Sequence, residues 1–188
     1  NLSLKVNYKS RNGLHEIQSV YCLINLFDTI KINKIKKKKD TISFKGPFGK
    51  FVNIKNNSVL KSLNKLRELN LISSYYTIEV RKNIPVLAGL GGGTSNAAYI
   101  LKHLLRNKIT NIILNKFEIL IGSDLRLFFK KQGFLKNLRT TIEFKKKQKF
   151  YFVLIQPNII CSTKDIYASV KSFTKKEHLN KNITKSKN

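Results

Sequence analysis

The sequence predicts an α+β fold, on three observations. Short segments with alternating apolar and polar residues, typical of half-buried strands, follow one another directly, as in residues 41–54. Residues 57–71 instead carry leucines with helical spacing, at Leu60, Leu63 and Leu66. Strands and helices do not alternate regularly, which disfavours a doubly wound parallel sheet. A chain of 188 residues can form one domain, or one domain and part of another.

The first half of the chain is predicted to be mostly strands. We expect strands at residues 2–6, 17–27 and 28–32, with a turn at Ser10–Gly13, where Asn-Gly accepts positive φ. The stretches TISFKGPFG (41–49) and KFVNI (50–54) are predicted to be short strands around a Gly-Pro turn. A helix is predicted at 57–71, and a further strand at 75–80.

The second half is predicted to be more helical. A helix at 95–106 would place Ala98, Leu101 and Leu105 on one side, and another at 115–123 would end at Gly122. Strands are expected at 140–144 and 150–157. A turn and helix are expected at 161–173, before a polar tail.

The large positive net charge has two possible explanations. The 37 Lys and Arg against 10 Asp and Glu give +27, which is typical of proteins that bind nucleic acid or anionic membranes. Yet 31 of these cations are Lys, and they accompany 20 Asn and 22 Ile, the residues that AT-rich codons encode. We favour drift in an AT-rich genome over a selected nucleic-acid surface, and expect the blocks at 34–39 and 145–149 to be solvated.

Neither the cysteines nor the apolar segments suggest an extracellular or membrane protein. Cys22 and Cys161 are far apart and form no CxxC pair, which fits a reducing compartment. No apolar run approaches the roughly 20 residues that cross a bilayer, and the first residues lack a signal-peptide core. We predict a cytoplasmic protein, in a bacterium rather than a plastid stroma.

A glycine-dense loop is the main candidate site. Four of the nine glycines lie between Gly89 and Gly93, after a predicted strand and before a predicted helix. Such a loop presents backbone N–H groups and the positive end of the helix dipole, which bind phosphate. Thr94 or Ser95 could cap the helix or face a phosphate or Mg²⁺. The loop is neither a Walker A motif nor GxGxxG, and the alternative is a turn whose helix packs tightly on a sheet.

The segment KNIPVLAGLGGGTSNAA resembles the ATP-binding loop of the GHMP kinases (galactokinase, homoserine, mevalonate and phosphomevalonate kinases). Within that superfamily, the loop is similar to that of the 4-diphosphocytidyl-2-C-methyl-D-erythritol kinases. Four further segments resemble motifs of the same family, in the same order: NLSLKVNYKSRNGLHEIQSV, NNSVLKSL, IGSDLRLFF and PNIICSTKDIY.

The resemblance implies a GHMP kinase architecture. Its N-terminal ATP-binding domain, resembling a ribosomal-protein-like fold with a left-handed βαβ crossover, would cover residues 1–147. The start of a ferredoxin-like substrate domain and a polar tail would cover 148–188. The implied activity is ATP-dependent phosphorylation of the 2-hydroxyl of 4-diphosphocytidyl-2-C-methyl-D-erythritol, in the non-mevalonate isoprenoid pathway, with Mg²⁺. The implied state is a monomer or weak homodimer without a specific nucleic-acid or membrane partner.

The resemblance also implies the residues that would bind ATP. Lys82 and Asn57 would border the adenine pocket, and Thr94 and Ser95 would lie near Mg²⁺. The loop around the phosphates would consist of Pro85, Val86, Leu87, Ala88, Gly89, Leu90, Gly91, Gly92, Gly93, Thr94 and Ser95. Leu87 replaces a glycine of the family, which would tighten or displace the first half of the loop.

Catalysis and substrate recognition are assigned to residues outside the loop. Asp124 matches the family's catalytic carboxylate, although by itself an Asp after Ile-Gly-Ser would be read as a helix cap. Arg126 stands where the family has Pro, and its charge would keep Asp124 ionised. His15 would hydrogen-bond the cytosine of the substrate, although a lone His after a turn is usually solvated. Leu14 replaces a stacking Tyr, which predicts weaker cytidine binding.

Other classes of function stay open at this point. They are another GHMP kinase, a basic nucleic-acid-binding protein, and a remnant without catalytic activity. The resemblance places the family's catalytic Lys just before Asn1 and a second glycine-rich motif after Asn188. On that basis we expect a fragment or a decayed gene product, in which these residues alone give little or no turnover.

Overall fold

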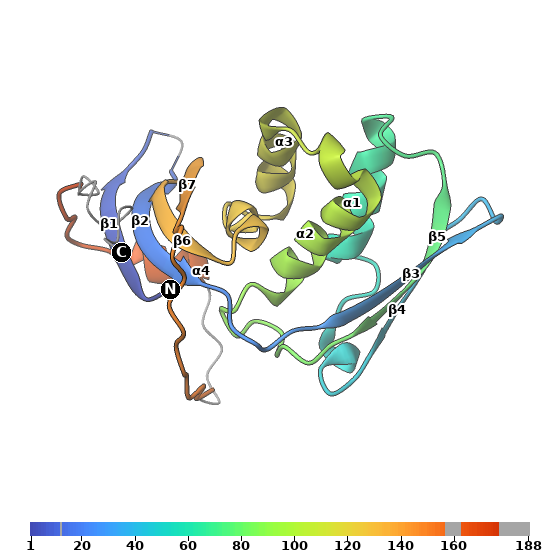
Figure 1. Ribbon diagram of the computed structural model, residues 1–188, viewed down its shortest axis with the longest axis horizontal. Helices are drawn as coiled ribbons and strands as arrows, with labels where there is room; N and C mark the ends of the chain where they lie inside the picture. Colours follow the sequence, from blue (N-terminus) through green and yellow to red (C-terminus); the bar gives the residue numbers. More distant parts are fainter. Residues whose placement is uncertain (12, 157–162, 177–188) are drawn as a thin grey trace. The chain divides into compact units, whose positions relative to one another are not determined.

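A computed structural model describes residues 1–11, 13–156 and 163–176 of the chain, and it confirms the predicted α+β class (Figure 1). The chain forms two compact units. The central unit is Ile24–Phe128, and the terminal unit combines Asn1–Leu23 with the residues from Phe129 onward. These units do not follow the expected division at 147/148, because the first 23 residues group with the later part of the chain. The assignment of domains to 1–147 and 148–188 stays a prediction.

The sheet of the central unit contains one parallel and one antiparallel pair. Its strands are β3 (Thr29–Ile35), β4 (Thr41–Lys45) and β5 (Tyr75–Arg81), in the order β3-β5-β4. Strand β5 pairs antiparallel with β3 and parallel with β4. Parallel neighbours need a crossover connection, and here helix α1 (Ser58–Glu68) supplies it. The expected βαβ unit is therefore β4–α1–β5.

Three helices lie on one face of this sheet (Figure 1). They are α1, α2 (Gly92–Leu105) and α3 (Asn111–Ile121), and α1 contacts the other two. Their buried side chains meet those of the sheet because helical and strand periodicity each collect apolar residues on one face. The core includes Val59, Leu63, Leu66, Ile78, Val80, Ala98, Ile100, Leu101, Leu105 and Phe117.

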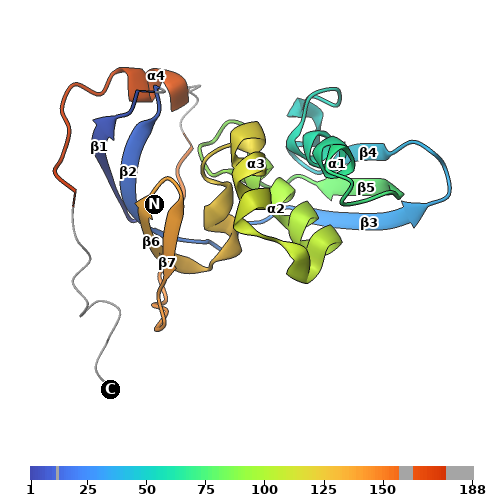
Figure 2. The same ribbon diagram turned by 90° about the horizontal axis from the view of Figure 1, so that it is seen from above.

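The terminal unit is an antiparallel sheet, as the view from above shows (Figure 2). Its strands are β1 (Ser3–Lys9), β2 (His15–Cys22), β6 (Gln132–Asn137) and β7 (Thr140–Glu143), in the order β1-β2-β6-β7. Helix α4 (Thr163–Ala168) belongs to the same unit. The segment after it returns to β1, where the backbone N–H of Thr174 donates to the carbonyl of Val6 at 2.8 Å.

Three predicted elements are wrong in part. Residues 50–54 form no strand, because a turn at Gly46 (φ 82°) leads into a 3-10 helix, η1 (Gly49–Phe51). The strand expected at 150–157 does not form over the described residues 150–156, which join no sheet. Strand β2 stops at Cys22, well before the expected residue 27.

One strand was not predicted, and the helices differ at their ends. Strand β6 reads QGFLKN, which lacks β-branched residues, and it is nevertheless buried at its first four positions. Helix α2 begins at Gly92 instead of 95, and α3 begins at Asn111 instead of 115. Part of the last expected turn and helix, including Cys161, lies outside the described residues.

Candidate active site

The glycine-dense loop connects β5 to α2, as the sequence predicts. Gly91 is the N-cap of α2 with φ 65°, in the left-handed region that favours glycine, and it offers no side chain to cap the helix. The first N–H groups of an α-helix have no partners within the helix. The expectation that Thr94 or Ser95 caps α2 is wrong, because the helix starts earlier and both residues lie within its first turn. The backbone N–H groups of this turn are therefore available for an anion.

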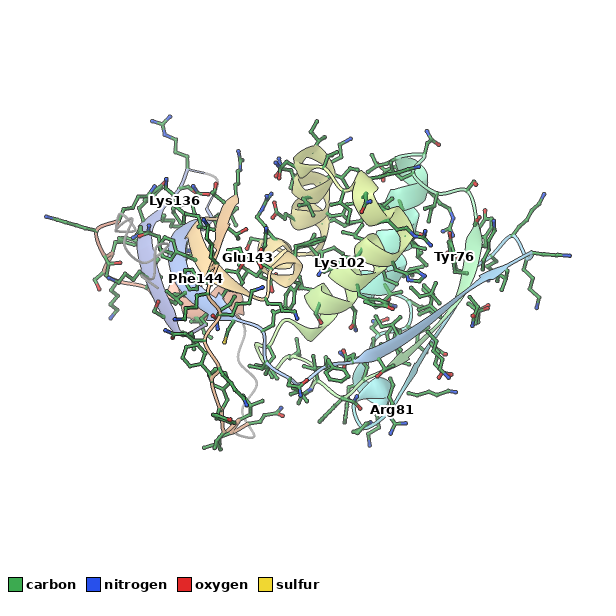
Figure 3. All side chains as sticks on the ribbon, in the orientation of Figure 1. Tyr76, Arg81, Lys102, Lys136, Glu143 and Phe144 are labelled. Atoms are coloured by element: carbon green, nitrogen blue, oxygen red, sulfur yellow. The ribbon has the colours of Figure 1, made fainter. Side chains whose placement is uncertain are left out.

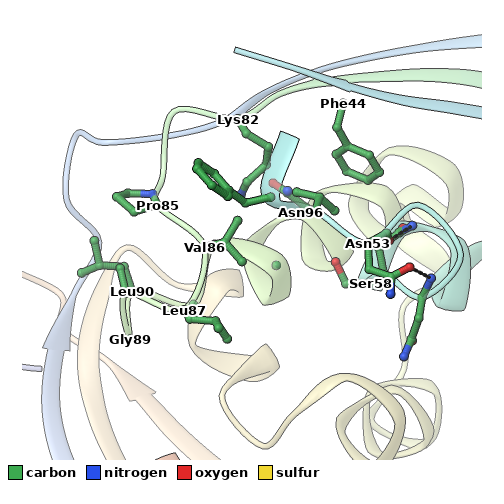
Figure 4. A pocket seen from close by; sticks show the side chains of 18 residues that line it. Phe44, Asn53, Ser58, Lys82, Pro85, Val86, Leu87, Gly89, Leu90 and Asn96 are labelled. Atoms are coloured by element: carbon green, nitrogen blue, oxygen red, sulfur yellow. Dashed lines mark hydrogen bonds between the residues drawn. The ribbon is translucent and has the colours of Figure 1, made fainter. Parts of the chain in front are cut away.

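A cavity of about 410 Å³ opens over this turn (Figure 4). Its lining contains all the loop residues from Pro85 to Gly93, together with the predicted Lys82 and Asn57. Thr94 and Ser95 are not part of it. The lining also includes Phe44, Asn53, Ser58 and Asn96, which were not predicted. These come from β4, the segment before α1, the start of α1 and the amino-terminal part of α2. Sequence spacing could not reveal them, because only the packing of helices on the sheet brings these segments together.

Lys82 is fixed beside the amino end of α2 by a buried carboxylate. Its side chain is 4% exposed and forms an ion pair with Asp28, which is 1% exposed. The other carboxylate oxygen of Asp28 accepts the backbone N–H groups of Asn83 at 2.8 Å and Ile84 at 2.9 Å. A Cβ placed on Gly92 would lie 3.2 Å from the Lys82 ammonium. Asp28 thus holds both the cation and the chain that leads into the loop, and no sequence signal had singled it out.

Asn57 has a structural role at the start of α1. Its carboxamide oxygen accepts the N–H of Leu60 at 2.9 Å, which is the usual N-cap bond. Its amide group donates to the carbonyls of Asn53 at 3.2 Å and Ile54 at 2.9 Å. Asn57 therefore shapes the wall of the cavity, while both ends of its side chain already have partners.

Asp124 lies against the glycine loop. A Cβ on Gly91 would be 3.1 Å from one of its carboxylate oxygens, and a Cβ on Gly122 would be 2.8 Å from the other. Burial raises the pKa of the Asp124 carboxyl above its usual value, and hydrogen bonds from its own backbone N–H and the Thr94 hydroxyl offset part of that rise. The structure thus brings the predicted catalytic carboxylate to the amino end of α2, next to Thr94.

Arg126 does not act on Asp124 as expected. Its guanidinium donates to both carboxylate oxygens of Glu118, at 2.7 and 3.0 Å, and to the side-chain oxygens of Asn111 and Asn115. The pKa of Asp124 is raised by burial, and the expectation that the charge of Arg126 keeps this carboxylate ionised is wrong. The guanidinium is engaged with helix α3 instead.

The segment that carries Arg126 is also held from a second side. It forms a 3-10 helix, η3 (Leu125–Phe129), directly after Asp124. Lys102 of α2, labelled in Figure 3, donates to the carbonyl of Phe128 at 2.6 Å. Burial lowers the pKa of Lys102. The turn at Asp124 is therefore attached to both α2 and α3.

Leu87 occupies a backbone conformation that suits glycine. Its φ is 62°, and its side chain is 72% exposed. A leucine in the left-handed region is strained because Cβ approaches the following carbonyl. The resemblance had placed a glycine of the family at this position, and the positive φ is consistent with that comparison.

The predicted substrate-binding residues belong to the terminal unit. His15 is the first residue of β2, and its ring stacks on Tyr167 at 5.3 Å between centroids and on Phe173 at 6.2 Å. Leu14 precedes it and is 50% exposed. The two aromatic partners were not predicted. They come from α4 and the segment after it, and only the fold brings them to β2.

The oxygen atoms near the loop suit a magnesium ion better than a softer metal. Thr94 hydroxyl and Asp124 carboxylate are hard oxygen donors, and the Ser95 hydroxyl donates to the carbonyl of Gly92 at 2.8 Å. Mg²⁺ commonly binds one or two such groups and completes its shell with phosphate oxygens and water. Over the described residues, no group of three or more His, Cys, Asp or Glu side chains is placed to hold a metal ion. These residues therefore fit Mg²⁺ that arrives with a phosphate compound.

Comparison with known proteins gives one domain match and several relatives that align over most of this chain. Residues 57–122 match the N-terminal domain of the GHMP kinases. The 4-diphosphocytidyl-2-C-methyl-D-erythritol kinase of Pelagibacter ubique is 38% identical over 93% of this chain and 63% of the relative. The kinase of the same name from Azobacteroides pseudotrichonymphae is 34% identical, over 95% of this chain and 68% of the relative. The chain thus spans slightly less than two thirds of the Pelagibacter protein.

Among solved structures, the homoserine kinase of Cytophaga hutchinsonii superposes with a TM-score of 0.51 at 21% identity. The match covers 85% of this chain and 55% of that one, and it indicates a shared fold. In the part of the chain that the structure describes, none of the helices has the length and apolar character needed to span a membrane.

Proposed function

Since the chain belongs to the 4-diphosphocytidyl-2-C-methyl-D-erythritol kinase family, within the GHMP kinases, we propose that it is an ATP-dependent kinase that phosphorylates the 2-hydroxyl of 4-diphosphocytidyl-2-C-methyl-D-erythritol. The proposed setting is the non-mevalonate route to isoprenoid precursors, in the bacterial cytoplasm where ATP is available. The relatives are bacterial and carry the name of this reaction.

One observation carries the proposal: a carboxylate lies against the glycine-rich amino end of a helix. The Asp124 carboxylate packs beside Gly91, where α2 begins at the edge of the cavity. Phosphoryl transfer depends mainly on positioning and on neutralising the charge of the phosphates. The N–H groups of the first turn of α2 would bind phosphate oxygens. Lys82 lies at the same end of the helix, where its ammonium is paired with the Asp28 carboxylate.

In the proposed reaction, the substrate hydroxyl oxygen attacks the γ-phosphorus of ATP. The bond between that phosphorus and the β,γ-bridging oxygen breaks, and ADP leaves. Asp124 orients the hydroxyl and takes its proton. A carboxyl whose pKa is raised by burial is a better proton acceptor than an ordinary Asp once it is ionised.

Thr94 and Ser95, with the phosphate oxygens, would hold Mg²⁺. When bound, the metal would neutralise charge on the phosphates. Thr94 additionally hydrogen-bonds Asp124 and so links the metal site to the proposed base.

We further propose that His15 recognises the cytosine of the substrate by hydrogen bonding. Stacking on Tyr167 and Phe173 restricts the orientation of its ring. Leu14 offers the base an apolar contact without a π-face, so cytidine binding should be weaker than with an aromatic residue at this position.

The test is a single-turnover assay over a long incubation, with the purified chain in excess over 4-diphosphocytidyl-2-C-methyl-D-erythritol and with MgATP present, because these residues alone are expected to give little or no repeated turnover. Phosphorus NMR of the product should show a new phosphomonoester, and ADP should appear in equal amount. Asp124→Asn should keep ATP affinity, measured by calorimetry, and slow the transfer step by at least about 100-fold.

Two results would contradict the proposal. One is a wild-type chain that does not bind ATP. The other is phosphorylation of homoserine or mevalonate in preference to the cytidine compound, which would indicate another GHMP kinase. Transfer at the same rate in Asp124→Asn would leave the kinase assignment standing and remove Asp124 from the role of base.

A further inference from the structure

The turn that contains Asp124 is closed by a buried ion pair. Glu118 in the last turns of α3 and Arg126 in η3 are eight positions apart, and Asp124 lies between them. Their charged groups are each 10% exposed and pair at 2.7 Å, with a second bond at 3.0 Å. The same Glu118 accepts the N–H of Gly122 on its backbone carbonyl at 3.0 Å. Glu118 therefore holds the turn at both ends.

The hydrogen bonds of Arg126 fix the orientation of its guanidinium as well as attaching it to α3. The fork of Arg126 also donates to Asn111 at 3.2 Å and Asn115 at 2.9 Å. These residues and Glu118 are spaced four and three positions apart, so they lie along one face of α3. A planar guanidinium bound to several fixed acceptors has only one orientation. That orientation sets where the backbone of η3 leaves the turn, and hence where Asp124 stands.

Two backbone hydrogen bonds within the turn connect the Glu118–Arg126 ion pair to Asp124. Leu125 donates its backbone N–H to Gly122 at 3.1 Å, and Leu127 donates to the carbonyl of Asp124 at 3.0 Å. The Asp124 side chain then packs between Gly91 and Gly122, in space that a Cβ on either glycine would enter. Because the fit is this close, a small shift of the turn would move the carboxylate away from the amino end of α2.

We propose that Arg126 is a positioning residue, which holds Asp124 at the glycine loop through its fork on Glu118, Asn111 and Asn115. The proposal rests on the proposed kinase function for its effect on rate. Arg126 is not among the residues that line the cavity, and its guanidinium is bound to side chains of α3. Its removal should therefore slow the transfer step while ATP binding is unchanged.

The test uses a double variant, Glu118→Gln with Arg126→Gln, because removing one partner alone would leave a buried charge unpaired. The matched control is Asp40→Asn with Arg67→Gln. That pair joins at 2.7 Å, is 8% and 20% exposed, and links α1 to the residue before β4 in the same unit. Each double variant removes one positive and one negative charge. Arg126→Lys, with Glu118 retained, keeps the charge and loses the fork.

Two readouts separate positioning from general stability. Amide hydrogen exchange should accelerate at Leu125 and Leu127 in the Glu118/Arg126 variant and stay as in wild type in the control. The single-turnover rate constant should fall about 100-fold, as expected when a catalytic group is displaced by about 1 Å. The dissociation constant for ATP should change by no more than a factor of about two, because substitutions at sites distant from one another usually act independently. Arg126→Lys should resemble the double variant.

The outcomes are distinguishable from failure of the proposed function. If wild type binds ATP without transferring phosphate, as the expectation of little or no turnover allows, the exchange rates alone decide whether Arg126 holds the turn. Unchanged exchange at Leu125 and Leu127 would overturn the positioning role. Equal losses of rate in the control variant, or full activity of Arg126→Lys, would overturn it as well.

Discussion

Asp124 and Leu87 are the two residues at which local stability and the proposed function oppose each other. Burial makes ionised Asp124 unfavourable in the folded chain, because few polar groups replace its water. Leu87 adopts a left-handed conformation on an exposed loop, where its side chain gains little from packing. Such local strain gathers at functional sites and is maintained by the surrounding structure.

Replacing Asp124 with Asn should raise the free energy of unfolding at neutral pH. The folded pKa of this carboxyl is raised, so its ionisation destabilises the folded state as pH rises from the unfolded pKa, about 3.9, through the folded pKa. Each unit of that rise corresponds to about 1.4 kcal/mol, which Asn would remove. Urea unfolding of both proteins between pH 4 and 8 measures the difference. We expect it to be smallest at the acidic end. A less stable Asp124→Asn at neutral pH would instead support a helix-capping role.

Leu87→Gly should be more stable than Leu87→Ala by about 1 kcal/mol, because alanine keeps the Cβ that a positive φ disfavours. Ala88→Gly is the matched control on the next residue, which is not among those with positive φ, and it should lose about 0.5–1 kcal/mol. Thermal unfolding measures all three variants. Equal stability of the glycine and alanine variants at position 87 would mean that the backbone there is not strained.

At the level of elements, the long periodic segments could be predicted and the ends and isolated strands could not. The leucines of residues 57–71 and the apolar spacing at Ala98, Leu101 and Leu105 correctly gave α1 and α2, because burial of one face dominates helix placement. The start of α2 was missed, since the N-cap is a glycine in a left-handed conformation and offers no capping side chain to detect. Strand β6 was missed because its neighbours β2 and β7 stabilise it despite its weak propensity.

The same limits apply to the candidate site. The glycine loop and Asp124 could be identified from motifs that are contiguous in sequence. Asp28 and Asn96 could not, because their relation to the loop arises from packing. Arg126 was noticed as an unusual residue, and its partner was assigned wrongly. Sequence proximity to Asp124 suggested a pair, whereas three acceptors along one face of α3 determine where the guanidinium points.

A prediction about the loop follows from two glycines with similar backbones and different surroundings. Gly91 and Gly89 have φ values of 65° and 70°, so alanine is strained at either. A Cβ at Gly91 would lie 2.7 Å from the Phe128 ring, whereas nothing lies within 4 Å at Gly89. Gly91→Ala should therefore weaken ATP binding more than Gly89→Ala does. It should also lower the free energy of unfolding by about 1–3 kcal/mol more than Gly89→Ala. Calorimetry with ATP and thermal unfolding test this. Equal effects would mean that Phe128 and Asp124 move aside freely.

For the whole molecule, the proposed functions are divided between the two compact units. The loop, the cavity and Asp124 all belong to Ile24–Phe128, and His15 with its aromatic partners belongs to the terminal unit. Sequence order could not show this division, since His15 and residue 129 onward are distant along the chain. The two binding functions should consequently respond separately to substitution.

His15→Ala should therefore weaken binding of the cytidine substrate, by about 10-fold for one lost hydrogen bond, and leave the affinity for ATP unchanged. Calorimetric titrations with each ligand measure both. Leu14→Tyr is the complementary variant and should tighten cytidine binding by restoring a π-face. Loss of ATP affinity in His15→Ala would contradict the assignment of the two sites to separate units.

The exposed apolar side chains of residues 150–156 affect how copies of the protein behave in solution. Tyr151, Val153 and Ile155 are 84–89% exposed, and over the described residues their backbone joins no sheet. Exposed apolar side chains gathered in one segment favour association with the same segment of another copy. The charge of +27 opposes that approach at low ionic strength, but its reach shrinks to about 8 Å at 0.15 M salt. Salt usually weakens the nonspecific binding of basic proteins to other molecules. Here added salt should instead promote association between copies of this protein.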